Sequence, residues 1–235
     1  MSPAFPYTIF PLGDSALTID FGNTIDIEIN NYVLGLFHHF KGGNNTGIID
    51  IVPAYSSLTF YYNVGIIRQI TSNKTAFETV KQVIEQELYE VLEPETKQLR
   101  KIRIPVCYSS TFGPDLPFIA SEKNIASEQI IQLHTSRLYT VYMIGFLPGF
   151  PYMGEVDDAI VIPRKKQPRT KVPQGAVGIA GKQTGIYPLE SPGGWQIIGR
   201  TPLKLFDNGK VHPVLLEPGD SVQFYPITED EFENY

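Results

Sequence analysis

The cationic side chains that could bind an anion are gathered in one short stretch. Five of the chain's 19 Lys and Arg residues fall within eight positions: Arg164, Lys165, Lys166, Arg169 and Lys171. Nearby prolines restrict the shape of this loop, and the chain as a whole is acidic, with a formal charge of −6. A local reversal of charge attracts a carboxylate, a phosphate or an acidic partner surface. A solvated loop that only keeps the domain soluble is the alternative interpretation.

A second candidate is the stretch GFLPGFPYMG at residues 145–154. Its glycines and prolines fix an irregular backbone, and Phe146, Phe150 and Tyr152 supply apolar area that a ligand could cover. Pro148, Phe150 and Tyr152 are therefore predicted binding residues. A structural corner between strands would use the same residues.

A glycine-rich segment at residues 175–187 carries polar groups that could recognise an amide or a carboxylate. It resembles a nucleotide-binding P-loop only superficially, because Gly175 and Gly181 enclose five residues where the motif needs four and Lys182 is followed by Gln183. Strand signals surround it and no helix is expected after it. We predict a hairpin with Lys182, Gln183 and Thr184 at its tip, and no recognisable ATP motif in this chain.

Two further residue types complete the predicted site. Trp195 is the only tryptophan and follows two glycines, so its indole could close a pocket or anchor the core. His134 falls late on a short expected helix and is a candidate for catalysis, although a lone histidine is more often structural.

One cysteine, Cys107, allows neither an internal disulfide nor a thiolate cluster and fits a reducing cytoplasm. We expect no metal site.

The elements that must position these residues differ between two parts of the chain. Residues 145–226 hold 23 of the 39 glycines and prolines. Before them, alternating strand and helix patterns predict an antiparallel sheet with two helices on one face; the strands are expected at 7–12, 16–21, 47–52, 57–62 and 101–106 and the helices at 24–40 and 77–91. Later short strands, expected at 139–144, 159–162, 175–180, 195–199 and 221–225, indicate a barrel or sandwich.

We therefore predict an α+β protein with three parts: an N-terminal domain at 1–106, a connecting segment at 107–137 and a β-barrel domain at 138–235. The connecting segment is expected to contain two short helices, one near 114–121 and one beginning at Ser127. No apolar run approaches the roughly 18 residues of a membrane helix. The N-terminus lacks the pattern of a secretory signal, which favours a cytoplasmic protein. A net acidic chain is a poor candidate for nucleic-acid binding.

Ordered motifs along nearly the whole chain resemble the 5-oxoprolinase B-subunit family, also described as KipI-like or allophanate hydrolase subunit 1. The matching motifs are LGDSA at 12–16, VPAY at 52–55, FGPDL at 112–116, LHT at 133–135, VYM at 141–143, GFLPGFPYMG at 145–154, PRTKVP at 168–173, GIAG at 178–181, QTGIYP at 183–188 and SPGGWQIIGRTP at 191–202. One departure is Ser109-Ser110, where the family usually places two glycines.

The resemblance implies a small N-terminal α/β domain and a cyclophilin-like C-terminal barrel. It also implies two partners, the KipA-like C subunit of 5-oxoprolinase and its A subunit, in a complex that uses ATP with Mg²⁺ to open 5-oxoproline to L-glutamate. Two alternatives remain open within the resemblance. One is a KipI-type inhibitor of a sensor histidine kinase, and the other is a component of a urea or allophanate carboxyltransferase.

Combined with the resemblance, the residues predict half of a site at the interface with the C subunit. Arg169 or Lys171 would hold an anionic group, and Gln183 would bind the lactam amide. The aromatic residues would exclude water. The predicted binding residues are Pro148, Phe150, Tyr152, Arg169, Lys182, Gln183, Tyr187 and Trp195, and the candidates for catalysis are His134, Arg169 and Lys171.

Overall fold

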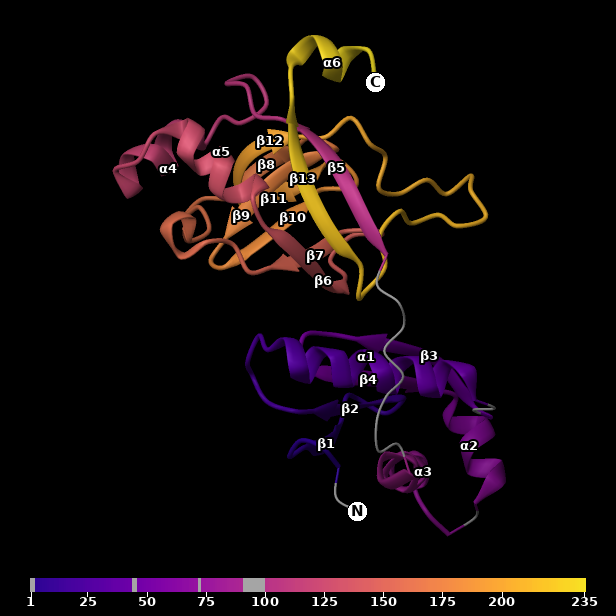
Figure 1. Ribbon diagram of the computed structural model, residues 1–235. Helices are drawn as coiled ribbons and strands as arrows, with labels where there is room; N and C mark the ends of the chain where they lie inside the picture. The colour runs from indigo at the N-terminus through magenta and orange to yellow at the C-terminus, as the bar shows by residue number, and fades with distance from the viewer. Residues whose placement is uncertain (1–2, 44–45, 72, 91–99) are drawn as a thin grey trace. The chain divides into compact units, whose positions relative to one another are not determined.

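The computed structural model describes residues 3–43, 46–71, 73–90 and 100–235 (Figure 1). The chain divides into two compact units, Met1–Gln98 and Leu99–Tyr235, which we call the N-terminal unit and the barrel unit. Each unit has an apolar core of its own. Within the described ranges, no helix combines the length and the apolarity needed to cross a bilayer.

The N-terminal unit is an antiparallel sheet with helices on one face, as predicted. Its strands are ordered β1-β2-β4-β3 and comprise β1 (Thr8–Pro11), β2 (Ala16–Asp20), β3 (Ile48–Pro53) and β4 (Ser57–Tyr62). Its helices are α1 (Ile27–Gly42), α2 (Val64–Ile70) and α3 (Ala76–Glu90). The short helix α2 was not predicted, and Val91, the last residue of the predicted α3 pattern, lies outside the described residues.

The pairing of β2 with β4 determines which side chains of the sheet face the helices. Leu17 and Ile19 of β2 pair with Phe60 and Leu58 of β4, so the four side chains share one face. All four are buried, in one cluster with apolar residues of α1 and α3. The helical spacing that predicted α3 is therefore the spacing that packs it against the sheet.

The barrel unit is built on a closed seven-stranded barrel. The strand order is β10-β7-β6-β13-β5-β12-β9, and β10 pairs with β9 to close it. The strands are β5 (Lys101–Cys107), β6 (Leu138–Ile144), β7 (Pro151–Gly154), β9 (Ala176–Ala180), β10 (Gln183–Ile186), β12 (Gln196–Arg200) and β13 (Ser221–Ile227). A separate two-stranded ribbon joins β8 (Arg169–Val172) to β11 (Ser191–Gly193).

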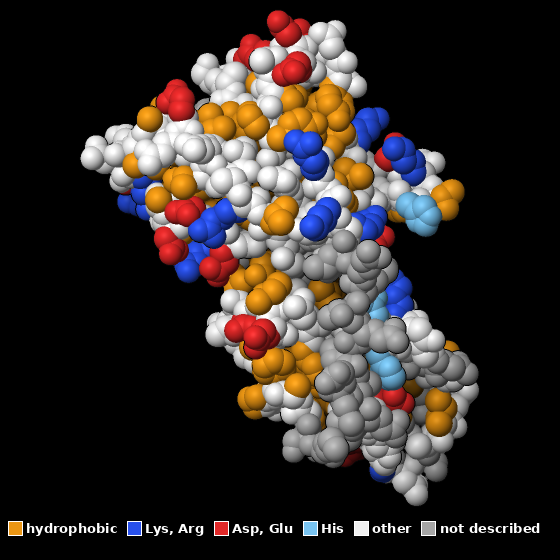
Figure 2. All heavy atoms as spheres, viewed as in Figure 1, with side chains coloured by type: hydrophobic (Ala, Val, Ile, Leu, Met, Phe, Trp, Pro, Cys, Tyr) orange, Lys and Arg blue, Asp and Glu red, His pale blue; other side chains and the backbone are white. Residues whose placement is uncertain are grey.

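The helices of the barrel unit are α4 (Leu116–Lys123), α5 (Ser127–Thr135) and α6 (Glu229–Glu233), with a 3₁₀ turn at Asp158–Ile160. Figure 1 shows α4 and α5 beside the barrel, and their residues Ile119 and Ile130 are fully buried in its core. Helix α6 begins with a capping box between Thr228 and Glu231. On the face drawn in Figure 2, carboxylates gather where this acidic helix lies.

The structure places the division of the chain at a different point from the predicted one. Strand β5 pairs in parallel with β13 and antiparallel with β12, so it belongs to the barrel rather than to a domain ending at residue 106. The segment 107–137 supplies core residues of the barrel and is no separate connector. The strand predicted at 159–162 is instead the 3₁₀ turn, because the Asp157 side chain accepts a hydrogen bond from the Ala159 amide and caps it.

Candidate functional site

Aromatic side chains of the barrel unit line a pocket of about 220 Å³. We call it the aromatic pocket. Its walls come from the loop before β7, from β7, from the loop before β8 and from β11 with its flanking residues. They comprise Phe146, Phe150, Tyr152, Arg164, Pro168, Tyr187, Pro192, Gly193, Gly194 and Trp195. None of these ten residues is acidic. Four predicted binding residues, Phe150, Tyr152, Tyr187 and Trp195, thus lie together.

Phe150 is at the centre of this wall. Its ring contacts those of Tyr152, Tyr187 and Trp195 at centroid distances of 4.9, 5.2 and 5.4 Å, two of them edge to face. Phe150, Tyr187 and Trp195 are buried. Edge-to-face packing of buried rings gives the pocket a rigid apolar floor.

Phe146 is the exception, because 62% of its surface is exposed at the pocket. Its φ of 66° lies in the left-handed region, which a bulky residue rarely adopts. Its ring meets Phe150 edge to face at 5.6 Å. A strained and exposed aromatic residue beside a pocket is typical of a ligand-binding loop.

Two of the five cations of the basic loop, Lys165 and Arg169, are paired with Asp115 at the start of α4. Both oxygens of this carboxylate accept from the Arg169 guanidinium, at 2.8 and 2.7 Å, and Lys165 Nζ lies 3.0 Å away. The Ile197 amide donates to the same carboxylate at 2.6 Å. Burial raises the pKa of Asp115, but the donors Arg169, Ile197 and Lys165 outweigh it, so the pKa lies below its ordinary value.

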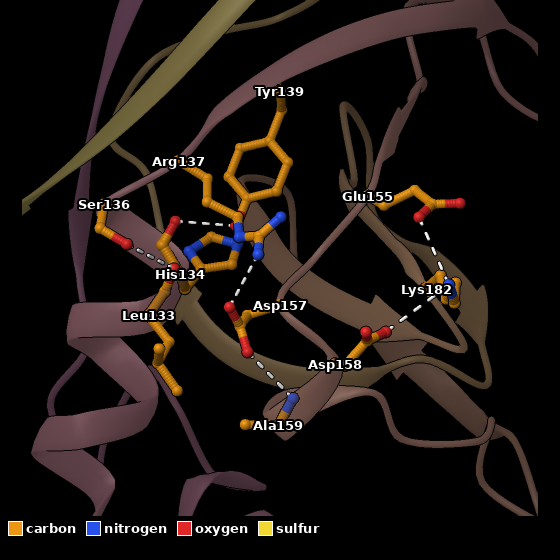
Figure 3. Close-up of polar contacts among 10 residues, drawn as sticks. All are labelled: Leu133, His134, Ser136, Arg137, Tyr139, Glu155, Asp157, Asp158, Ala159 and Lys182. Atoms are coloured by element: carbon orange, nitrogen blue, oxygen red, sulfur yellow. Dashed lines mark hydrogen bonds and ion pairs between the residues drawn. The ribbon is translucent and has the colours of Figure 1, made fainter. Parts of the chain in front are cut away.

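The other predicted cations also have acidic partners. Lys171 lies 3.0 Å from Glu190 at an exposed position. Figure 3 shows Lys182 between Asp158 and Glu155, at 3.5 and 3.4 Å. The negative charges of Asp158, which has the larger effect, and of Glu155 raise the pKa of Lys182. Arg169, Lys171 and Lys182 are absent from the pocket lining, so their predicted contact with an anion gains no support from the geometry.

His134 lies in the barrel core with no exposed surface. Its Nδ1 is 2.9 Å from the Tyr108 hydroxyl and its Nε2 is 2.9 Å from Thr184 Oγ1. Because Thr184 donates its hydrogen to the Gly178 carbonyl, we assign the proton to Nε2, and Nδ1 then accepts from Tyr108. Burial lowers the pKa of His134 to about 3.

The polar contacts around His134 are those of a structural residue. Its ring stacks on Phe224 at 4.6 Å, and its carbonyl accepts from the Tyr139 hydroxyl at 2.9 Å (Figure 3). A neutral imidazole with both nitrogens paired and no surface cannot reach a substrate. The predicted catalytic role of His134 therefore gains no support.

The remaining predicted residues lie outside the pocket lining. Pro148 is exposed in the loop before β7, and Gln183 is half-buried on β10, paired with Ala180 of β9. The predicted hairpin at 175–187 is present, but its tip is shorter than expected, because Gln183 and Thr184 belong to β10. In the described part of the chain, no group of three His, Cys, Asp or Glu residues could hold a metal ion.

Sequence reasoning did not single out Arg164 or Asp115. The Arg164 guanidinium lies 5.9 Å from the centre of the Trp195 ring, in cation–π contact at the pocket. Arg164 was one of five clustered cations, and nothing in the loop distinguished it. Asp115 lay in a recognised motif, but its partners are 50 or more positions away along the chain.

Comparison with known proteins gives a consistent assignment. Residues 7–216 match the family described as "Carboxyltransferase domain, subdomain C and D". The 5-oxoprolinase B subunit of Bacillus subtilis is 42% identical over 97% of this chain and 96% of its own length. Urea amidolyase of Lachancea kluyveri is 26% identical over 100% of this chain but only 14% of its own length.

A solved structure of TTHA0988 agrees with the fold, with a TM-score of 0.77 and 35% sequence identity over 90% of this chain. This chain spans 40% of the length of that structure. Since the family match covers most of the chain and the Bacillus relative aligns over nearly all of both sequences, this chain belongs to the 5-oxoprolinase B-subunit family and carries a carboxyltransferase domain of the C and D type.

Proposed function

We propose that this chain is the B subunit of an ATP-dependent 5-oxoprolinase, which opens 5-oxoproline to L-glutamate together with the A and C subunits. The observation that carries the proposal is the 42% identity to the B subunit of Bacillus subtilis 5-oxoprolinase over 97% of the chain. The aromatic pocket supports it, because a compact pocket with apolar walls and one cation suits a small cyclic carboxylate.

The chemistry explains why a dry pocket is useful. A lactam is a stable electrophile, so its carbonyl must be activated, for instance through phosphorylation of its oxygen, before water can open the ring. Phe146, Phe150 and Trp195 would keep bulk water away from the activated group. The residues that hold ATP and Mg²⁺ are proposed to lie on the partner subunits, because the 175–187 hairpin lacks the P-loop pattern and the helix that would follow it.

The proposal is tested by reconstituting the chain with the A and C subunits and measuring glutamate release from 5-oxoproline. Phe146→Ala should lower the rate about tenfold, equivalent to about 1.4 kcal/mol, because the exposed wall of the pocket is lost. Assembly of the complex should be unaffected. Phe118→Ala is the matched control, since Phe118 is an exposed phenylalanine on α4 outside the pocket.

Two results would contradict the proposal. A correctly assembled complex that releases no glutamate would favour a regulatory role, such as inhibition of a sensor kinase. Hydrolysis of ATP by this chain alone would contradict the placement of the ATP site on the partners.

A component of a urea or allophanate carboxyltransferase is the second candidate. It is favoured by the matched carboxyltransferase domain and by the alignment with urea amidolyase along the whole of this chain. Such a component requires a biotin carrier on another protein. Transfer of a carboxyl group from a biotin carrier to urea, in an assembly that does not open 5-oxoproline, would select this candidate.

A further inference from the structure

We propose that Arg164 binds the carboxylate of a small cyclic acid whose ring lies in the aromatic pocket, and that it selects anionic substrates over neutral lactams. The inference rests on the proposed function in taking 5-oxoproline as the acid. The residue that binds the carboxylate is thus Arg164 rather than Arg169 or Lys171, the cations expected from the sequence.

The cations of the basic loop differ in whether an acidic partner compensates them. Arg169 and Lys165 share Asp115, and Lys171 pairs with Glu190. Across the residues that the structure describes, Arg164 forms no ion pair, and it is the only charged residue of the pocket lining. The pocket therefore presents an uncompensated positive charge to a ligand.

The guanidinium group of Arg164 has the geometry that a carboxylate requires. The guanidinium carbon lies 5.9 Å from the centre of the Trp195 ring, in cation–π contact, and the N–H donors of the group lie in its own plane. A carboxylate matches this planar arrangement with two parallel hydrogen bonds. Lysine could supply the charge at this position but not the two-point geometry.

Arg164 is attached to a backbone that neighbouring contacts hold in place. The next residue, Lys165, donates its amide to the Gly194 carbonyl at 2.7 Å, beside Trp195. The Lys165 and Arg169 side chains are bound to Asp115, whose side chain is only 5% exposed. A loop held at Lys165 and Arg169 loses less conformational entropy when a ligand binds.

The pocket itself limits the class of ligand. Its volume of about 220 Å³ and its aromatic walls suit a small ring. Burial raises the pKa of the Tyr152 and Tyr187 phenols, so both remain neutral and do not oppose an anion. A small ring with a single carboxylate can pack against the aromatic walls and pair with Arg164 at the same time.

Trp195 allows a direct test, because it is the only tryptophan and it lines the pocket. The full-length chain would be titrated with 5-oxoproline, with pyrrolidinone, which has the ring without the carboxylate, and with acetate, which has the carboxylate without the ring. Tryptophan fluorescence and the single indole N–H signal in NMR spectra report binding. We expect saturable changes with 5-oxoproline and at least about tenfold weaker binding of the other two.

Variants assign the effect to one side chain. Arg164→Gln should weaken 5-oxoproline binding roughly ten- to hundredfold and leave pyrrolidinone binding unchanged, and Arg164→Lys should recover part of the loss. Lys171→Gln is the matched control from the same loop and should bind like the parent. Thermal unfolding of each variant checks that the fold is intact.

Equal binding of 5-oxoproline and pyrrolidinone would overturn the inference, as would an unchanged affinity in Arg164→Gln or a titration without any saturable change at Trp195. Failure of the proposed function is distinguishable from these results. Arg164-dependent binding without glutamate release by the complex would reject the 5-oxoprolinase assignment alone. Glutamate release with an unchanged KM in Arg164→Gln would reject the role of Arg164 alone.

Discussion

At the scale of single residues, buried polar groups in the barrel unit are paired by residues far away along the chain. Asp115 joins Arg169 and the Ile197 amide, which lie 54 and 82 positions further on. Removing one member of such a buried pair is costly, because the remaining charge has little access to water. Composition revealed the cations of the basic loop but not this partner, so Arg169 was predicted to hold a ligand.

His134 leads to a prediction about pH. Its pKa is about 3 in the folded chain, against 6.5 for the free side chain. Between these values the unfolded chain binds the additional proton, so the free energy of unfolding must fall as the pH is lowered through this window. The denaturant midpoint should drop between about pH 7 and about pH 4.5. His134→Gln should be less stable at neutral pH, by about 1–3 kcal/mol, because hydrogen bonds are lost.

The decisive quantity is the difference in the free energy of unfolding between parent and variant across this pH range, since other groups titrate in both proteins. The gap should narrow at lower pH. His212→Gln, at an exposed position, is the control and should run parallel to the parent. A constant gap for His134→Gln would contradict the buried neutral imidazole.

At the scale of elements, glycines set how closely the barrel strands and the pocket walls approach each other. A Cβ on Gly185 would lie 3.0 Å from the Trp195 ring and 2.8 Å from the Pro151 carbonyl oxygen. A Cβ on Gly193 would lie within 3 Å of the Tyr187 ring and hydroxyl. The glycines that marked this part of the sequence are therefore needed to let the aromatic side chains close on the pocket floor.

Gly175 offers the clearest test of this role. Its φ is +82°, and a Cβ there would lie 2.3 Å from the Thr201 carbonyl oxygen. Gly175→Ala should destabilise the barrel unit by about 2–4 kcal/mol, since strain in the left-handed region adds to overpacking. Gly209→Ala, where no close contact or positive φ exists, should change stability by less than about 1 kcal/mol. Equal denaturant midpoints for the two variants would contradict this account.

The elements that sequence reasoning located best are those with a clear period. Helices α1 and α3 and strands β2 and β4 carry regular apolar spacing over one buried face. Strands β7, β8, β10 and β11 are only three or four residues long, and all but β8 contain glycine or proline, which hides the alternation. The pocket was found in part because its aromatic residues sit in motifs, whereas the position of Arg164 depends on the fold around Trp195.

At the scale of the whole molecule, the division of the chain predicts which pieces fold. The fragment 99–235 contains the entire barrel and should fold by itself. The fragment 107–235 lacks most of β5, whose residues Ile104 and Val106 are fully buried, and should not fold. Each lost core side chain costs about 2–5 kcal/mol, and β13 and β12 also lose their hydrogen-bond partner.

Circular dichroism and the emission of Trp195 would compare the two fragments. The longer fragment should unfold in one cooperative transition with buried tryptophan fluorescence. Cooperative unfolding of 107–235 would show that β5 is dispensable and would support the boundary predicted at residue 106.

The parallel pairing of β5 with β13 also determines the order of events during synthesis. The ribosome releases β5 early in the barrel unit, but its partner, Ser221–Ile227, is synthesised only after all the other barrel strands. Until then β5 has an unpaired edge that can associate with other chains. Closure of the barrel therefore waits until residues 221–227 have been synthesised, and a nascent chain halted before residue 221 would leave this edge of β5 exposed to association.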